Sequence, residues 1–240
     1  MLTNLISDGF TTGAIISVLL SIPVILFALT IHEFSHGFAA KLMGDPTAYN
    51  LGRLTLNPAK HLDPIGTLMM LLVGFGWAKP VPINTRYFRK PKWGMLLSAL
   101  AGPMSNLIFG YISYVISFAV YRFSFMYDLR LFIPFGSYTL AGGLETVDYI
   151  MMAVYLLFYF SFIMNVGLAI FNLLPIPPLD GSRILFGILP ARYYFEVMRY
   201  EQYISIAVMI LLVSGVLSRP LGILRGLVEQ LFELSVVWMK

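Results

Sequence analysis

The chain has 240 residues, of which 58% are hydrophobic and only 12% are charged, whereas a soluble domain has roughly 25% charged residues. This composition and the mean hydropathy of +0.80 exclude an ordinary soluble domain and indicate a protein embedded in a lipid bilayer. The net charge of +4 does not predict a nucleic-acid partner, because the basic residues fall in short loops between apolar segments. With no cysteine, disulfides and thiolate zinc ligands are excluded.

The first apolar segment predicts a long helix from Thr12 to Met43. About 20 residues cross a bilayer, so this helix must tilt, bend or protrude. The polar stretch after it contains a β-like patch at Arg53–Leu56. The apolar segment Ile65–Phe75 is too short to span comfortably, and basic residues lie on both sides of it. This pattern predicts a re-entrant segment that enters and leaves the membrane on the cytoplasmic side.

Three later segments predict further spans, at Trp93–Tyr121, Thr146–Leu174 and Tyr203–Leu217. The first two are separated by Arg122–Glu145, which we expect to be an external loop. Between residues 220 and 240, charged side chains recur at helical spacing among leucines. That pattern is typical of an amphipathic helix lying at the membrane interface.

Lysines and arginines concentrate in the loops 41–60, 79–92 and 183–199. The positive-inside bias therefore places these loops in the cytoplasm and the N-terminus outside. The predicted fold class is an all-α integral membrane protein, a polytopic helical bundle with a short re-entrant segment and small β-like patches near the site. No repeat or linker divides it, so we expect one domain, with its core at residues 12–217.

The sequence His32-Glu33-Phe34-Ser35-His36 lies in the cytoplasmic half of the first predicted helix. Histidines at i and i+4 project from one helical face and can bind one metal ion, and the glutamate can take a proton from water on that metal. Ionisable residues inside a bilayer are costly and indicate a functional site. The alternative is a pair of histidines that are only hydrogen-bonded inside the bundle.

A catalytic zinc ion needs a third protein ligand and an open fourth position. Without cysteine, the candidates are His61 and the carboxylates. Asp180 stands out because it follows a proline-rich break at residues 175–178 and precedes Gly181. Asp180 could equally be the N-cap of the next helix, so the residues alone leave both roles open. His61 is most simply a loop histidine bonded to the backbone or to Asp63.

Two motifs together resemble the site-2 protease family of intramembrane zinc metalloproteases. One is His32–His36 after an apolar helix, and the other is Asn172-Leu173-Leu174-Pro175-Ile176-Pro177-Pro178-Leu179-Asp180-Gly181. The segment Ala101-Gly102-Pro103-Met104-Ser105-Asn106 is also similar to that family. The chain resembles the smaller subgroup without a PDZ domain, because the loop Arg122–Glu145 is too short to hold one.

The resemblance implies that one Zn²⁺ ion per chain is held by His32, His36 and Asp180, with Glu33 as the catalytic glutamate. It implies a catalytic contact with the substrate or transition state for Asn172. It also leads us to expect substrate contacts at Asn106. Independently of the resemblance, the patch that contains Arg53 and Leu54 could offer an edge to an unwound substrate, and an amphipathic loop is the simpler interpretation of the same residues.

The implied activity is cleavage of peptide bonds in or near the transmembrane segments of membrane proteins. The implied setting is a multi-pass protein of a prokaryotic cell membrane, with the site toward the cytoplasm. The expected partners are a transmembrane protein substrate and the lipid bilayer. Two alternatives stay open: a metal-ion transporter that uses the same ligands, and an inactive relative that only binds substrates.

Overall fold

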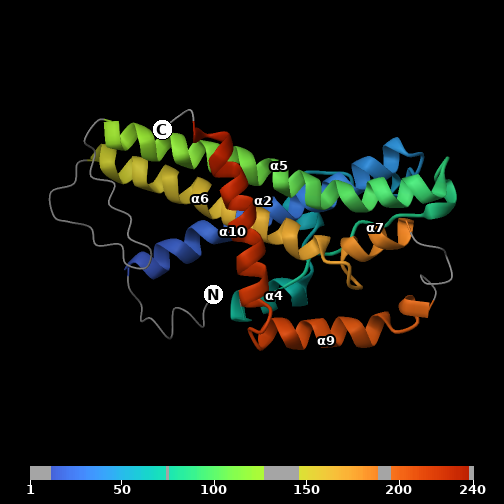
Figure 1. Cartoon of the computed structure of the whole chain (residues 1–240). Helices are drawn as coiled ribbons and strands as arrows, with labels where there is room; N and C mark the ends of the chain where they lie inside the picture. The colour runs from blue at the N-terminus through green and yellow to red at the C-terminus, as the bar shows by residue number, and fades with distance from the viewer. Residues whose placement is uncertain (1–11, 74–75, 127–145, 189–195, 238–240) are drawn as a thin grey trace.

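The computed structural model describes residues 12–73, 76–126, 146–188 and 196–237. Three long helices run side by side and form the body of the molecule (Figure 1): α2 (Thr12–Leu42), α5 (Pro91–Met126) and α6 (Thr146–Leu173). All three contact one another, and the contact of α5 with α6 is the most extensive. They position the functional site, which lies where α2 meets α5 and the end of α6.

Three helical segments among the described residues are long and apolar enough to cross a membrane, namely Val18–Leu42, Pro91–Phe123 and Ile150–Leu173. They confirm the first three predicted spans. The fourth predicted span corresponds to α9 (Glu201–Val213), which is followed by α10 (Ser218–Ser235) after a bend of 81°. The two count as a fourth candidate span only if they are taken together.

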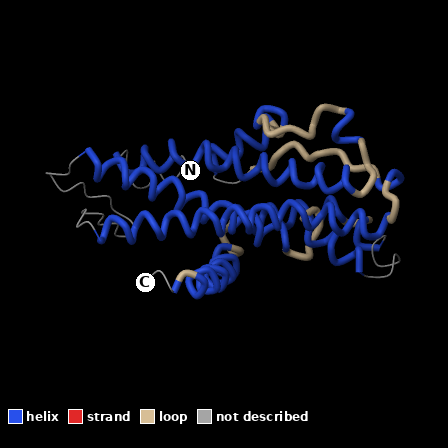
Figure 2. The backbone as a smooth tube through the Cα atoms, turned by 90° about the horizontal axis from the view of Figure 1, so that it is seen from above, coloured by secondary structure: helices blue, strands red, loops and turns tan. Residues whose placement is uncertain are grey.

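The polar region between α2 and α5 consists of short elements. These are α3 (Thr47–Asn50), the 3₁₀ turns η1 (Pro58–Lys60) and η2 (Thr85–Tyr87), and α4 (Pro64–Val73). The described residues contain no β-strand (Figure 2), and their only extended pairing is an isolated antiparallel bridge between Leu62 and Ala78. The predicted β-like patches are therefore not confirmed. The re-entrant placement of the segment around α4, of which Phe75 lies outside the described residues, stays a prediction.

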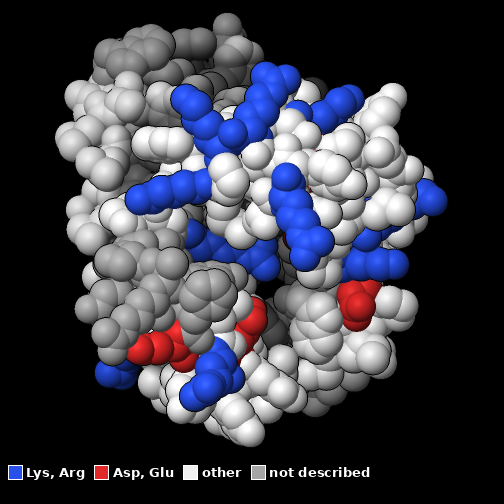
Figure 3. Space-filling view, turned by 90° about the vertical axis from the view of Figure 1, so that its right-hand side faces the viewer, with Lys and Arg blue, Asp and Glu red and all other residues white. Residues whose placement is uncertain are grey.

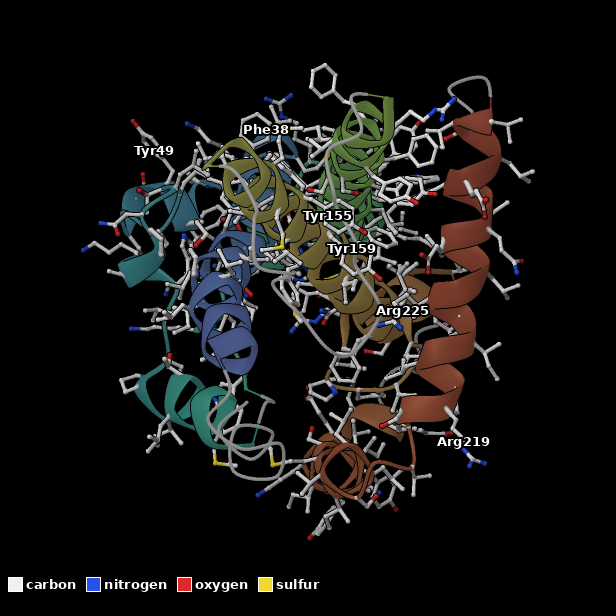
Figure 4. All side chains as sticks on the ribbon, turned by 90° about the vertical axis from the view of Figure 1, so that its left-hand side faces the viewer. Phe38, Tyr49, Tyr155, Tyr159, Arg219 and Arg225 are labelled. Atoms are coloured by element: carbon white, nitrogen blue, oxygen red, sulfur yellow. The ribbon has the colours of Figure 1, made fainter. Side chains whose placement is uncertain are left out.

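Helix α10 crosses the bundle against α5 and α6 and contributes to its core (Figures 1 and 4). Phe162, Val166 and Ile170 of α6 are buried at this contact, and Phe232 of α10 packs on them. In Figure 4, Arg225 points toward α6, whereas Arg219 points away from the bundle. The interfacial position predicted for residues 220–240 stays a prediction, as does the predicted external loop, most of which lies outside the described residues.

Lysine and arginine side chains gather at the end of the molecule where α2 ends and α5 begins (Figure 3). The exposed basic residues of the polar region between these helices are Lys60, Lys79, Arg86, Arg89 and Lys90. The same face is hollowed in its middle (Figure 3). This charge distribution agrees with the predicted cytoplasmic location of that end, which stays a prediction.

Candidate metal centre

Helix α2 carries the two histidines of the site. Their spacing of four residues places both imidazoles on the face that packs against α5, and the residues are only 5% and 7% exposed. The Nε2 atoms of His32 and His36 lie 3.0 Å apart. The rings are nearly perpendicular, with an interplanar angle of 87°, so that both Nε2 atoms converge on one point.

Asp180 completes the cluster from the first residue of α7 (Asp180–Ile188). Helix α6 ends at Leu173, and the proline-rich turn after it brings Asp180 back to the bundle. The Oδ2 atom of Asp180 lies 3.1 Å from the Nε2 atoms of both His32 and His36. Gly181 makes this turn possible, because a Cβ atom there would collide with the carbonyl oxygens of Leu173 and Leu174. The short distances from Oδ2 of Asp180 to both Nε2 atoms favour the predicted ligand role over that of an N-cap.

The spacing of the three donor atoms fits one zinc ion. All three lie within 4.8 Å of one another, and each pair is separated by 3.0–3.1 Å. Tetrahedral ligands at about 2.0–2.1 Å from zinc are themselves about 3.3 Å apart. The three donor atoms therefore need to move apart by only a few tenths of an ångström to hold a zinc ion between them. Such a set of three ligands would leave a fourth position for water or substrate.

The partners of the other ring nitrogens assign the tautomers. His36 Nδ1 lies 2.7 Å from the carbonyl oxygen of Ser98, which can only accept, so this nitrogen carries the proton. His32 Nδ1 lies 2.6 Å from Oδ1 of Asn106, which is also an acceptor. When both rings are neutral, their Nε2 atoms present lone pairs to the carboxylate of Asp180. A metal cation held between these three acceptors would satisfy all of them, as in metal sites whose histidines donate their second N–H outward.

Asn106 connects the site to the rest of the bundle. Its side chain is fully buried, and its amide nitrogen donates to the carbonyl of Ala28 at 3.1 Å and to Oδ1 of Asn165 at 2.8 Å. Asn165 of α6 donates in turn to the carbonyl of Ser161 at 2.8 Å. A continuous polar chain therefore joins α2, α5 and α6 within the apolar spans, and it fixes the orientation of His32.

Gly102 of α5 allows the two helices to approach at the level of the histidines. A Cβ atom there would collide with the imidazoles of both His36 and His32. The next residue, Pro103, lies inside the helix and removes one of its backbone hydrogen bonds. The glycine therefore lets α5 lie directly against the two histidines.

Glu33 follows the first ligand on α2 and is held from a different element. Its Oε2 atom accepts a hydrogen bond of 2.8 Å from the backbone amide of Val81, in the extended segment between α4 and α5. The side chain is half-buried, beside the cluster and not within it. The expected role of Glu33 as a general base stays a prediction.

The family model described as Peptidase family M50 matches residues 20–215, a range that includes both histidines, Glu33 and Asp180. The chain belongs to peptidase family M50. This assignment confirms the resemblance to site-2 proteases that the sequence motifs indicate.

Curated bacterial proteins match most of the chain. YwhC of Bacillus subtilis is 37% identical over 198 residues, which cover 82% of this chain and 80% of YwhC. Rip2 of Mycolicibacterium smegmatis is 26% identical and covers 81% of this chain and 66% of Rip2. Rip2 of Mycobacterium tuberculosis (strain H37Rv) is 28% identical, and the match covers 88% of this chain and 72% of that Rip2. The names of all three describe them as candidate zinc metalloproteases. No solved structure matches this chain.

The structure brings together four of the residues expected at the M50 site, namely His32, His36, Asp180 and Glu33, and it places Asn106 directly behind His32. Asn172 is not in hydrogen-bond contact with them, because its amide donates to the carbonyl of Leu168 within α6 at 2.9 Å.

The expected substrate edge at Arg53 and Leu54 and the loop histidine His61 are not part of the cluster. The guanidinium of Arg53 contacts the segment that holds Glu33, and Leu54 lies beside Gly37 of α2. His61 is buried and bonds through Nε2 to the carbonyl of Thr55 at 2.8 Å, as expected for a loop histidine bonded to the backbone.

Sequence reasoning missed Ser98, Asn165 and the amide of Val81. Asn165 carries a signal that could have found it, since a polar side chain in an otherwise apolar span indicates function or an interhelical hydrogen bond. Ser98 and Val81 contribute backbone atoms, for which the identity of the side chain gives no signal.

Proposed function

We propose that the chain is an intramembrane zinc metalloprotease that cleaves peptide bonds in or near the transmembrane segments of membrane-protein substrates. The observation that carries this proposal is the buried cluster of His32, His36 and Asp180 at the contact of membrane-spanning helices, with Glu33 beside it. Ionisable side chains at such a depth are costly without a function. Membership of peptidase family M50 and the names of the relatives support zinc and proteolysis.

In this mechanism, bound zinc would polarise the scissile carbonyl and lower the pKa of the attacking water to about 7. Glu33 accepts the proton of that water and passes it to the leaving amine. Its Oε2 atom is bonded to the amide of Val81, so Oε1 is the oxygen that performs this transfer. Asn172 turns away from Leu168 and donates to the substrate backbone or to the developing oxyanion.

The substrate must unwind locally, because a transmembrane helix hides its carbonyls in its own hydrogen bonds. We propose that Leu54 lies along the path of the unwound segment. The hydrogen bonds of Arg53 to the carbonyls of Lys79 and Pro80 favour a positioning role for Arg53 over the expected substrate contact. The hydrogen bonds of Asn106 within the protein favour a role in orienting His32, and its contact with substrate stays a prediction. The bacterial relatives support a prokaryotic cell membrane, and the basic end of the bundle supports a site that opens to the cytoplasm.

The test uses purified protein in lipid nanodiscs and a panel of fluorogenic single-span peptides, with and without a zinc chelator. We expect chelator-sensitive cleavage that falls by at least about 100-fold in Glu33→Gln, because general-base catalysis contributes 10²–10⁴-fold, while zinc content is retained. Full activity of Glu33→Gln would refute the role of the glutamate. Zinc flux in proteoliposomes without cleavage would favour a transporter, and peptide binding without cleavage an inactive relative.

A further inference from the structure

A short extended segment between α4 and α5 donates a backbone hydrogen bond to Glu33, the proposed catalytic glutamate. This segment, Lys79-Pro80-Val81-Pro82, is called the strap below. It lies against the C-terminal half of α2, and the backbone amide of Val81 donates to Oε2 of Glu33 at 2.8 Å. A hydrogen bond from a backbone amide to a carboxylate is charge-assisted and is stronger than one between neutral groups. The position of the strap therefore sets the position of the carboxylate.

The sequence of the strap explains why it presents this amide. Lys79 and Val81 each precede a proline, which restricts both residues to extended backbone conformations. Pro80 and Pro82 have no N–H group, so Val81 provides the single backbone donor between Lys79 and Ile83. Val81 is itself only 7% exposed. The strap is therefore a stiff segment that offers one donor, and Glu33 accepts from it.

Two residues of the polar region also bind the strap, Arg53 through its side chain and His61 through its backbone carbonyl. One guanidinium nitrogen of Arg53 donates to the carbonyl of Lys79 at 2.8 Å and to that of Pro80 at 3.2 Å. The amide of Lys79 donates to the carbonyl of His61 at 2.8 Å. The side chain of His61 in turn donates from Nε2 to the carbonyl of Thr55 at 2.8 Å, which ties the strap to the loop that carries Arg53.

Helix α2 carries a glycine, Gly37, where the strap lies against it. Gly37 lies one turn after Glu33, and a Cβ atom at Gly37 would be 3.0 Å from Cγ1 of Val81. That distance is too short for an unstrained contact, so the glycine allows the strap to lie directly on the helix. The strap is thus held by α2 and by the contacts with Arg53 and His61.

We propose that Arg53 and His61 are positioning residues for Glu33, which act through the strap and touch neither zinc nor substrate. The inference rests on the proposed function, because it concerns the same glutamate. The strap binds only Oε2 and leaves Oε1 for the proton transfer. A general base works only when its carboxylate is held in hydrogen-bond reach of the water. The contacts of Arg53 and His61 with the strap supply that constraint.

The first experiment measures kcat and KM of peptide cleavage for Arg53→Gln, with Arg86→Gln as the matched control. Arg86 is exposed and lies on the same polar region without a hydrogen bond from its side chain among the described residues. We expect kcat to fall about 10-fold or more in Arg53→Gln, with KM and zinc content unchanged. Arg53→Lys keeps the charge but lacks the planar guanidinium that bridges the two carbonyls. Its kcat should therefore lie between that of the wild type and that of Arg53→Gln.

His61 supplies a second and independent variant. His61→Leu removes the donor to Thr55 and should lower kcat without changing KM. His61→Gln can place an amide N–H near the position of Nε2, so it should recover part of the loss. Recovery by the glutamine variant separates positioning through this hydrogen bond from a general packing defect.

The second experiment needs no activity. Hydrogen exchange of the Val81 amide is measured in full-length protein for the wild type, Arg53→Gln and Glu33→Ala. Exchange should accelerate about 10–100-fold in both variants, because each removes a constraint on that amide. If no preparation cleaves any peptide but exchange behaves as expected, the proposed proteolysis fails while the strap contact stands.

Three results would overturn the proposal. A higher kcat in Arg53→Gln would mean that the strap blocks Glu33 instead of orienting it. A raised KM at constant kcat would make Arg53 a substrate-binding residue. Unchanged exchange at Val81 in Glu33→Ala would mean that the hydrogen bond does not exist in the membrane-embedded protein.

Discussion

Replacement of Asn106 by alanine tests whether the polar chain behind His32 controls the metal site. The substitution removes the acceptor for His32 Nδ1 at 2.6 Å and the donors to Ala28 and Asn165 at 3.1 and 2.8 Å. His32 then loses the bond that orients its ring and fixes its tautomer. Loss of such an outer-sphere partner lowers metal affinity by about 10–100-fold, which corresponds to about 1.4–2.8 kcal/mol.

The assay is competition for zinc against a chelator of known affinity, together with thermal unfolding in the same detergent. Asn106→Asp provides the matched comparison: it keeps an acceptor for His32 but cannot donate to Ala28 or Asn165. We therefore expect near-normal zinc affinity and reduced thermal stability in Asn106→Asp. In Asn106→Ala, we expect both the zinc affinity and the thermal stability to fall. Unchanged zinc affinity in a folded Asn106→Ala protein would refute the assigned role of the hydrogen bond.

Three other substitutions follow from the same geometry. Asp180→Ala should release zinc on dialysis, because it removes one of three ligands, and stoichiometric zinc measured afterwards by atomic absorption would contradict the ligand role. Gly102→Ala should weaken zinc binding in the chelator competition, since the new methyl group would displace both imidazoles, whereas Gly222→Ala, with open space around its Cβ position, should not. Asn172→Ala should lower kcat by about 100-fold with zinc affinity unchanged, and a normal kcat would remove Asn172 from the catalytic residues.

Much of the fold could be predicted because apolar length determines it. The helix predicted at Thr12–Met43 appears as Thr12–Leu42, and the span predicted at Thr146–Leu174 appears as Thr146–Leu173. The limits of the prediction lie in the polar region, where Arg53–Leu56 alternates as a strand does but has no neighbouring strand to pair with among the described residues. Its hydrogen bonds go instead to side chains and turns, and periodicity cannot reveal such partners.

The site was predictable where a side chain supplies the chemistry and unpredictable where the backbone does. The i, i+4 spacing places His32 and His36 on one face in any helix. The prediction of Asp180 as a third ligand needed the family resemblance, because Asp180 approaches the histidines only through the turn after α6 and its sequence suits an N-cap equally well. The carbonyl of Ser98 and the amide of Val81 leave no mark in the sequence, since any residue at either position has the same atom.

The polar atoms that orient the metal ligands also hold the helices together. Lipid offers little hydrophobic driving force for helix association, so spans associate through small residues and interhelical hydrogen bonds. The chain from His32 through Asn106 and Asn165 crosses α2, α5 and α6, and Gly110 of α5 allows close approach to Val166 of α6. These contacts do not include Asp180. The framework around the histidines is therefore built independently of the third ligand, and α7 can bring Asp180 to a site that is already oriented.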